Sequence, residues 1–184
     1  GVALNPLEVR VAGTAMEEAA PESAASVETL LMLQGSLFPN AVEALQELEE
    51  EGWRGMGCVS VRLMNPFPED EIHRWIGGLR ALAVLDRSNS FGSVPPLASR
   101  IFNACARRRN DGSGAGPPVL RTLVGGLGGR EITVPEMKAL ILSTHLLFSP
   151  WEPWEGEALE RWLEEDGVLR DWIEEVAALQ MRAL

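Results

Sequence analysis

A chain of 184 residues with 46% apolar content is long enough for one domain with a sizeable core. Its formal net charge of −11 argues against nucleic acid and against an anionic membrane surface as partners, because both require a basic binding surface. No apolar run approaches the about 20 residues that span a bilayer and no signal peptide opens the chain, so we expect a cytoplasmic protein.

The first predicted elements follow an expected lead-in and flexible loop over residues 1–27. Within it, residues 8–12 are either a short strand or extended chain, and an Ala-, Glu- and Ser-rich stretch without apolar periodicity follows. The apolar run at 29–33 predicts a buried strand. A helix is expected over 39–50, with Pro39 in its first turn, and the next strand over 58–63.

The second group of elements continues the alternation of helix and strand. Three acidic residues favour the start of a helix over 69–76, which ends before two glycines. A short apolar strand over 81–85 precedes a helix over 95–108. A strand over 119–124 and a helix over 134–147 complete the series, and the last helix begins with capping-box spacing.

This alternation over residues 28–148 predicts an α/β domain with a mainly parallel sheet and helices on both faces. Residues 149–184 differ in composition and are expected to form a helical C-terminal extension rich in tryptophan and glutamate. This tail either packs on its own domain or offers an interface to a partner, because aromatic residues dominate interface cores. The interface residues would be Trp151, Trp154, Trp162 and Trp172.

The polar stretch after residue 85 is the leading candidate for a functional loop. In open parallel sheets, ligands and partner groups gather at the carboxyl ends of the strands. The expected contact loop therefore comprises Asp86, Arg87, Ser88, Ser90 and Gly92. The alternative is that Asp86 and Ser88 only hold a tight turn through the neighbouring backbone.

A glycine-rich turn follows the strand over 119–124 and is expected to lie beside the contact loop. Its spacing does not match a dinucleotide-binding fingerprint, and no Lys-Ser or Lys-Thr pair is present for a P-loop. The glycines are expected to let the backbone turn sharply or approach another chain closely. The residues assigned to this turn are Gly126, Gly128, Gly129 and Arg130.

No catalytic, cofactor-binding or metal-binding residue is assigned from the sequence. Cys58 and Cys105 are far apart without a CxxC spacing, so buried free thiols are favoured over a cluster, a zinc site or a disulfide. His73 and His145 each lie in a helical segment without a second ligand at a suitable spacing.

Several segments together, in one order, resemble a known family. They are Cys-Val-Ser-Val-Arg-Leu-Met-Asn-Pro-Phe from residue 58, Pro-Glu-Asp-Glu-Ile from 68, Ala-Val-Leu-Asp-Arg-Ser-Asn-Ser-Phe-Gly from 83, and Gly-Leu-Gly-Gly-Arg-Glu-Ile-Thr from 126. This pattern resembles the second domain of the alpha part of thiamine-diphosphate-dependent 2-oxoacid:ferredoxin oxidoreductases, such as pyruvate:ferredoxin oxidoreductase. Glu131 stands where the family usually has Asp.

The resemblance implies a domain similar to the C-terminal domain of transketolase. It further implies a non-catalytic structural role in an oligomeric assembly that converts a 2-oxoacid to acyl-CoA, in which the domain braces the thiamine-binding parts and mediates subunit contacts. Thiamine diphosphate and iron–sulfur clusters are then expected in the partner parts and not in this chain alone.

Two alternatives to this role follow from the residues. A free-standing α/β domain would bind an anion or another small ligand through Arg87 and Arg130. A protein-interaction module would act through the tryptophan-rich tail.

Overall fold

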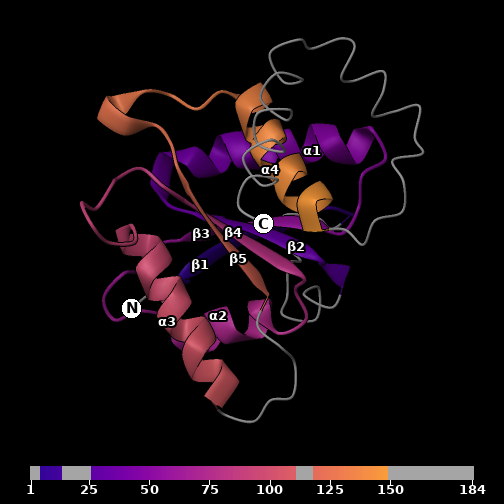
Figure 1. The fold of residues 1–184 in the computed structure, drawn as a ribbon. Helices are drawn as coiled ribbons and strands as arrows, with labels where there is room; N and C mark the ends of the chain where they lie inside the picture. The colour runs from indigo at the N-terminus through magenta and orange to yellow at the C-terminus, as the bar shows by residue number, and fades with distance from the viewer. Residues whose placement is uncertain (1–4, 14–25, 111–117, 149–184) are drawn as a thin grey trace. The chain divides into compact units, whose positions relative to one another are not determined.

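A computed structural model of the chain describes residues 5–13, 26–110 and 118–148. Within these residues, five strands form one sheet in the order β1-β3-β2-β4-β5. The strands are β1 (Leu7–Val11), β2 (Thr29–Leu33), β3 (Met56–Val61), β4 (Ala81–Asp86) and β5 (Val119–Val124). The strands β2 to β5 run parallel, whereas β1 pairs antiparallel with β3 (Figure 1). The predicted, mainly parallel sheet is confirmed.

Helices cover both faces of this sheet, as predicted. They are α1 (Phe38–Glu50), α2 (Glu69–Ile76), α3 (Pro96–Asn110) and α4 (Val134–Phe148), with the short 3-10 turns η2 (Gly35–Leu37) and η3 (Leu127–Gly129). α1 packs beside α4 on one face, and α2 packs beside α3 on the other (Figure 1). No helix in the described ranges is long and apolar enough to cross a bilayer.

Three strands differ in their bounds from the sequence prediction: β1 covers 7–11 and not 8–12, β3 covers 56–61 and not 58–63, and β4 covers 81–86 and not 81–85. β3 begins at Met56 and not at Cys58, because Gly57 lies inside the strand and does not end the preceding loop. A side chain at Gly57 would meet Leu30 Cδ1 at 3.0 Å and the carbonyl oxygen of Arg10 at 3.2 Å. β4 extends to Asp86, which was expected to begin the following loop.

The core lies between the sheet and the two helix layers. β2 is buried along its whole length because it occupies the centre of the sheet. Alternate residues of β2, β3 and β4 face α2 and α3, where they form a continuous apolar cluster. Its members include Leu30, Met32, Val59, Val61, Leu82 and Val84 from the sheet and Ile72, Trp75, Ile76, Leu97 and Ile101 from the helices.

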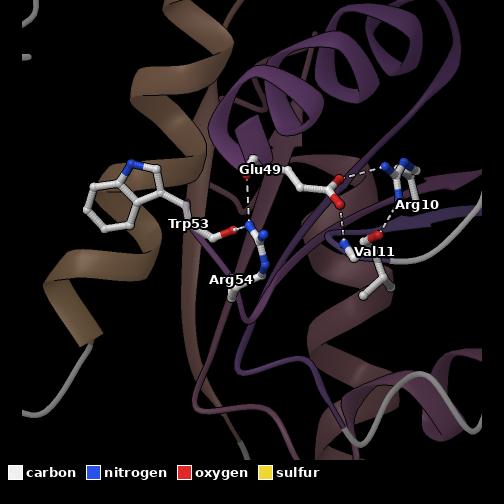
Figure 2. A network of polar contacts seen from close by, with 6 residues as sticks. Arg10, Val11, Glu49, Trp53 and Arg54 are labelled. Atoms are coloured by element: carbon white, nitrogen blue, oxygen red, sulfur yellow. Dashed lines mark hydrogen bonds and ion pairs between the residues drawn. The ribbon is translucent and has the colours of Figure 1, made fainter. Parts of the chain in front are cut away.

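A polar network fastens β1 to the end of α1 (Figure 2). Arg10 Nη2 lies 2.8 Å from Glu49 Oε2, and the Gly13 amide donates a hydrogen bond of 2.8 Å to Glu49 Oε1. Arg54 Nη1 donates hydrogen bonds to the carbonyl oxygens of Glu49 and Trp53 at 2.8 and 2.7 Å. Glu49 thus fixes β1 through its carboxylate and the turn after α1 through its carbonyl oxygen.

Two residues of α4, Lys138 and His145, make polar contacts that fix this helix. Lys138 Nζ lies 3.0 Å from Glu47 Oε2 and 2.6 Å from Glu51 Oε1, which ties α4 to α1. Burial lowers the pKa of Lys138, but its hydrogen bonds to the two carboxylates raise it overall. His145 Nδ1 lies 2.9 Å from the hydroxyl oxygen of Thr29, which links α4 to the first residue of β2.

Three of the predicted segments fall largely or wholly outside the described residues. They are the loop at 14–26, the loop at 110–118 and the tail at 149–184, which contains Trp151, Trp154, Trp162 and Trp172. The domain boundaries at 27/28 and 148/149 and the role of the four tryptophans stay predictions.

Candidate functional site

The candidate site lies where the parallel strands end. The connection from β2 passes to β3 through α1, and the connection from β4 passes to β5 through α3 on the opposite face. β2 and β4 are neighbours, so their carboxyl ends form the point at which the chain diverges in two directions. This is the position at which open parallel sheets bind ligands and partners. The β4–α3 and β5–η3 connections leave the sheet at this same end (Figure 1).

Asp86 occupies the inner layer of this site. Only 4% of the residue is exposed, and its two carboxylate oxygens accept hydrogen bonds from the amides of Leu97 and Ala98 at 3.3 and 3.0 Å. These amides belong to the first turn of α3 and would otherwise lack an acceptor. The sequence placed Asp86 in the exposed loop, but the structure places it in β4 as the cap of α3.

Arg87 is the first exposed residue of this edge. Its Nη1 donates a hydrogen bond of 2.9 Å to the hydroxyl oxygen of Ser36 in η2. A methyl group added at Gly126 would lie 3.3 Å from Arg87 Nε. The residues that follow β2, β4 and β5 therefore meet around one guanidinium group, and the expected proximity of the contact loop and the glycine-rich turn is observed.

The remaining residues of the expected contact loop are more open. Ser88 and Gly92 are exposed, and Ser90 is half-buried. The Ser90 carbonyl oxygen accepts a hydrogen bond of 3.2 Å from the Ser93 amide, which closes a turn around Phe91. Phe91 is 101% exposed, so its whole ring faces outward. Their function as a contact loop stays a prediction.

The glycine-rich turn after β5 is formed by glycines in the left-handed region of φ/ψ space. Gly126 has φ 68° and ψ 26°, and Gly128 has φ 66° and ψ 20°, a region that side-chain-bearing residues rarely adopt. A methyl group at Gly126 would also lie 3.0 Å from the carbonyl oxygen of Arg130. The sharp turn expected from the glycines is therefore present.

Arg130 is held at the end of this turn by the start of α4. Its Nη2 contacts Glu136 Oε1, while Glu136 Oε2 accepts a hydrogen bond of 2.9 Å from the Thr133 amide. The predicted capping box between Thr133 and Glu136 is thus present. Burial raises the pKa of Glu136, but the hydrogen bonds from Thr133 and Arg130 lower it overall.

Several apolar side chains are exposed in the segments at this same end of the sheet. Within the described ranges, five of the six large apolar residues that are strongly exposed follow or end a parallel strand at its carboxyl side. They are Leu63, Phe91, Val94, Val124 and Leu127, and we call this set with Arg87 the edge surface. Sequence analysis missed these apolar members, although a bulky apolar residue beside glycine or serine in a predicted loop was an available signal.

The residues of the described segments do not fit a metal or cluster site. No group of three or more His, Cys, Asp or Glu side chains that could hold a metal ion occurs there. Cys58 and Cys105 are buried and free, and burial raises their pKa values to about 12 and about 11. The expectation of buried free thiols is confirmed. The two buried cysteines and the absence of such a metal-binding group leave no ligand set for an iron–sulfur cluster in this part of the chain.

The two histidines are used structurally. His73 Nε2 lies 2.9 Å from the carbonyl oxygen of Ala104, which joins α2 to α3. His145 contacts Thr29 at the amino end of β2, opposite the edge surface.

Comparison with known proteins gives one family. Residues 27–137, more than half of the chain, match the family described as pyruvate:ferredoxin oxidoreductase core domain II. The ketoisovalerate oxidoreductase subunit VorA of Pyrococcus furiosus is 32% identical over 115 residues, covering 60% of this chain and 26% of that protein. The pyruvate synthase subunit PorA of Thermotoga maritima is 31% identical over 109 residues, covering 57% of this chain and 25% of that protein. The chain thus spans about a quarter of the length of these relatives.

A solved structure supports the fold assignment. A split-gene transketolase, described as an inactive beta4 tetramer, superposes with a TM-score of 0.50 and 14% identity, covering 67% of this chain and 40% of that one. The transketolase-like fold expected from the sequence is confirmed by this similarity.

Proposed function

This chain belongs to the pyruvate:ferredoxin oxidoreductase core domain II family, and from that premise we propose that it is an accessory, non-catalytic part of a 2-oxoacid:ferredoxin oxidoreductase assembly. Its role is to brace the thiamine-binding parts and to mediate contacts between subunits. The assembly decarboxylates a 2-oxoacid oxidatively and forms acyl-CoA, with thiamine diphosphate and iron–sulfur clusters in the partner parts.

The observation that carries the proposal is the edge surface. Monomeric proteins rarely leave several large apolar side chains exposed together unless they bind something there. Phe91 is fully exposed at the tip of a turn, and Leu127 is half exposed on the neighbouring turn. Aromatic side chains of this kind contribute most of the binding energy at protein interfaces. This combination of exposed apolar side chains and one arginine fits a partner protein better than a small anion.

The site offers little for a catalytic role. Arg130 pairs with Glu136, and Asp86 is occupied by the amides of α3. Among the described residues of the edge surface, Arg87 is the charged group, and its Nη1 is engaged with Ser36. This chemistry can orient a partner's carboxylate or carbonyl group, which suits a bracing role.

The test is native mass spectrometry of the complex purified from its source. We expect co-purifying subunits that carry thiamine diphosphate and iron–sulfur clusters. A double variant, Phe91→Ser with Leu127→Ser, should raise the dissociation constant for these subunits at least about 30-fold, the equivalent of losing one strong interface residue. The matched control is Val119→Thr, because Val119 is as exposed as Leu127 but lies at the opposite end of β5.

Two outcomes would contradict the proposal. A lone chain, or a simple homo-oligomer without cofactors, would remove the assembly and favour the ligand-binding alternative at Arg87. If a well-folded double variant retains its subunits unchanged, the chain still belongs to the assembly, but the edge surface is not its contact with them.

A further inference from the structure

The outer side of β5 ends the sheet within the described residues. The Val119 amide donates to the carbonyl oxygen of Arg80 at 2.9 Å, and the Gly125 amide donates to that of Asp86 at 3.0 Å. In a parallel ladder, both backbone polar groups of a residue point to one side, and successive residues alternate. The amides and carbonyls of Leu120, Thr122 and Val124 are therefore directed away from β4.

β5 has little of the usual protection of an edge strand, because Arg121 is its one charged residue. Natural edges carry proline, lysine or a β-bulge that discourages further pairing. The sequence Val-Leu-Arg-Thr-Leu-Val contains neither proline nor lysine, and its register with β4 is unbroken from Val119 to Val124. Its residues are half-buried or exposed, whereas most of β1, the opposite edge, is buried. Within the described residues the two edges thus differ, and β5 is the more exposed one.

Arg121 gives this edge a preference for negative charge. It pairs in register with Ala83, on the sheet face that α1 and α4 cover. Its Nη1 is shielded from solvent and has no hydrogen-bond partner among the described residues. Burial lowers the pKa of this guanidinium. A carboxylate placed beside this half-buried guanidinium would balance its charge.

We infer that the outer edge of β5 is a strand-addition site for an extended segment of a partner subunit, which places an acidic side chain against Arg121. The inference rests on the proposed function, because the partner is another subunit of that assembly. Strand addition supplies backbone hydrogen bonds to Leu120, Thr122 and Val124, and side-chain pairing supplies selectivity. A second copy of β5 is a poorer occupant, because it would bring a second Arg121 and no carboxylate.

The direct test is amide-resolved hydrogen exchange on the assembly purified from its source and on the isolated full chain. We expect the amides of Leu120, Thr122 and Val124 to exchange at least about tenfold more slowly in the assembly. The amides of Arg121 and Leu123 face β4 and serve as internal references, because they should exchange slowly in both samples.

Substitutions supply an independent readout. Thr122→Pro removes an outward amide and should weaken subunit association at least about tenfold, whereas Thr122→Val keeps the amide and the strand propensity and should not. Arg121→Gln should weaken association more than Arg121→Lys does. The exchange measurement needs no variant, so a Thr122→Pro chain that fails to fold leaves the inference testable.

The outcomes separate this inference from the proposed function. An assembly whose β5 amides exchange as fast as in the isolated chain overturns the strand-addition site and leaves the accessory role intact. Protection already present in a homodimer of the isolated chain overturns the choice of occupant. The absence of any assembly in native mass spectrometry overturns both.

Discussion

Arg87 and Ser36 join two loops across the point where the sheet connections diverge, through a hydrogen bond of 2.9 Å from Nη1 to Oγ. Both residues are exposed, so water competes for this bond. Ser36→Ala should therefore lower the free energy of unfolding by no more than about 1 kcal/mol, as measured by urea denaturation. A larger loss would show that the pair supports the fold and not the orientation of Arg87.

Asp86 should contribute far more to stability than an exposed acidic residue does. Asp86→Ala leaves the amides of Leu97 and Ala98 buried without an acceptor, and we expect a loss of about 2 kcal/mol in the free energy of unfolding. The matched control is Asp70→Ala in the exposed first turn of α2, for which about 0.5 kcal/mol or less is expected. Equal effects of the two substitutions would contradict the capping role.

Gly126 is predicted to reject even a methyl group. Gly126→Ala forces a side chain into left-handed backbone and to 3.0 Å from the Arg130 carbonyl oxygen, at an expected cost of about 1–2 kcal/mol in thermal or urea unfolding. Gly78→Ala is the control, because nothing lies within 4 Å of its added methyl group. A stable Gly126→Ala chain would show that the turn has a second accessible conformation.

His145 should make the stability of the chain depend on pH. Burial lowers its pKa from the usual value, with Glu28 raising it and Arg80 lowering it to smaller extents. The unfolded state then binds the proton more readily, so stability is present above the unfolded pKa of about 6.5 and is lost as pH falls below it. Urea unfolding between pH 7.5 and 5.5 measures this loss.

The His145→Gln variant provides the comparison. It should be less stable than the unmodified chain at pH 7.5, and the difference should shrink as the pH falls, because the variant has no imidazole to protonate. His73→Gln retains His145 and should keep this pH dependence. Parallel stability curves for the unmodified chain and His145→Gln would rule out His145 as the source.

The two cysteines should be chemically inert in the folded chain. Burial raises their pKa values to about 12 for Cys58 and about 11 for Cys105, so little thiolate exists near pH 8. Reaction with an aromatic disulfide reagent should be negligible in buffer and should reach two equivalents in denaturant. Rapid modification of either thiol at pH 8 without unfolding would contradict this burial.

The sequence predicted most of the sheet because its strands are apolar runs separated by clear breakers. It could not predict the direction of β1, since five residues carry no sign of whether they pair parallel or antiparallel. The direction is set by long-range contacts, such as the backbone pairing with β3 and the contact of Arg10 with Glu49, 39 positions later in the chain. The predicted start of β3 was wrong at Gly57, because a glycine inside a strand resembles a loop residue in the sequence. Its place in the strand is explained by its close neighbours in the structure.

The location of the site was predicted, but not which of its side chains are buried and which are exposed. Leu-Asp-Arg correctly marked the carboxyl end of β4, yet only the packing of α3 shows that Asp86 turns inward while Arg87 turns outward. The edge surface was missed because exposure of Phe91 and Leu127 depends on which side of each turn faces the core. The local pattern marks them as apolar residues in predicted loops, but their exposure follows from tertiary contacts.

The hydrogen bonds from the α3 amides to Asp86 also affect which part of this domain can change its sequence in evolution. Because the carboxylate grips the first amides of α3, the segment at 87–95 leaves the scaffold and returns to it at almost the same point. Lengthening a loop whose ends are already pinned adds little entropic cost, about 0.6 kcal/mol for each doubling of its length. Residues near Phe91 can therefore be exchanged, inserted or deleted with the sheet unchanged. The fold thus separates a fixed scaffold, the sheet and α3, from a variable loop at 87–95, in which new partner preferences can evolve.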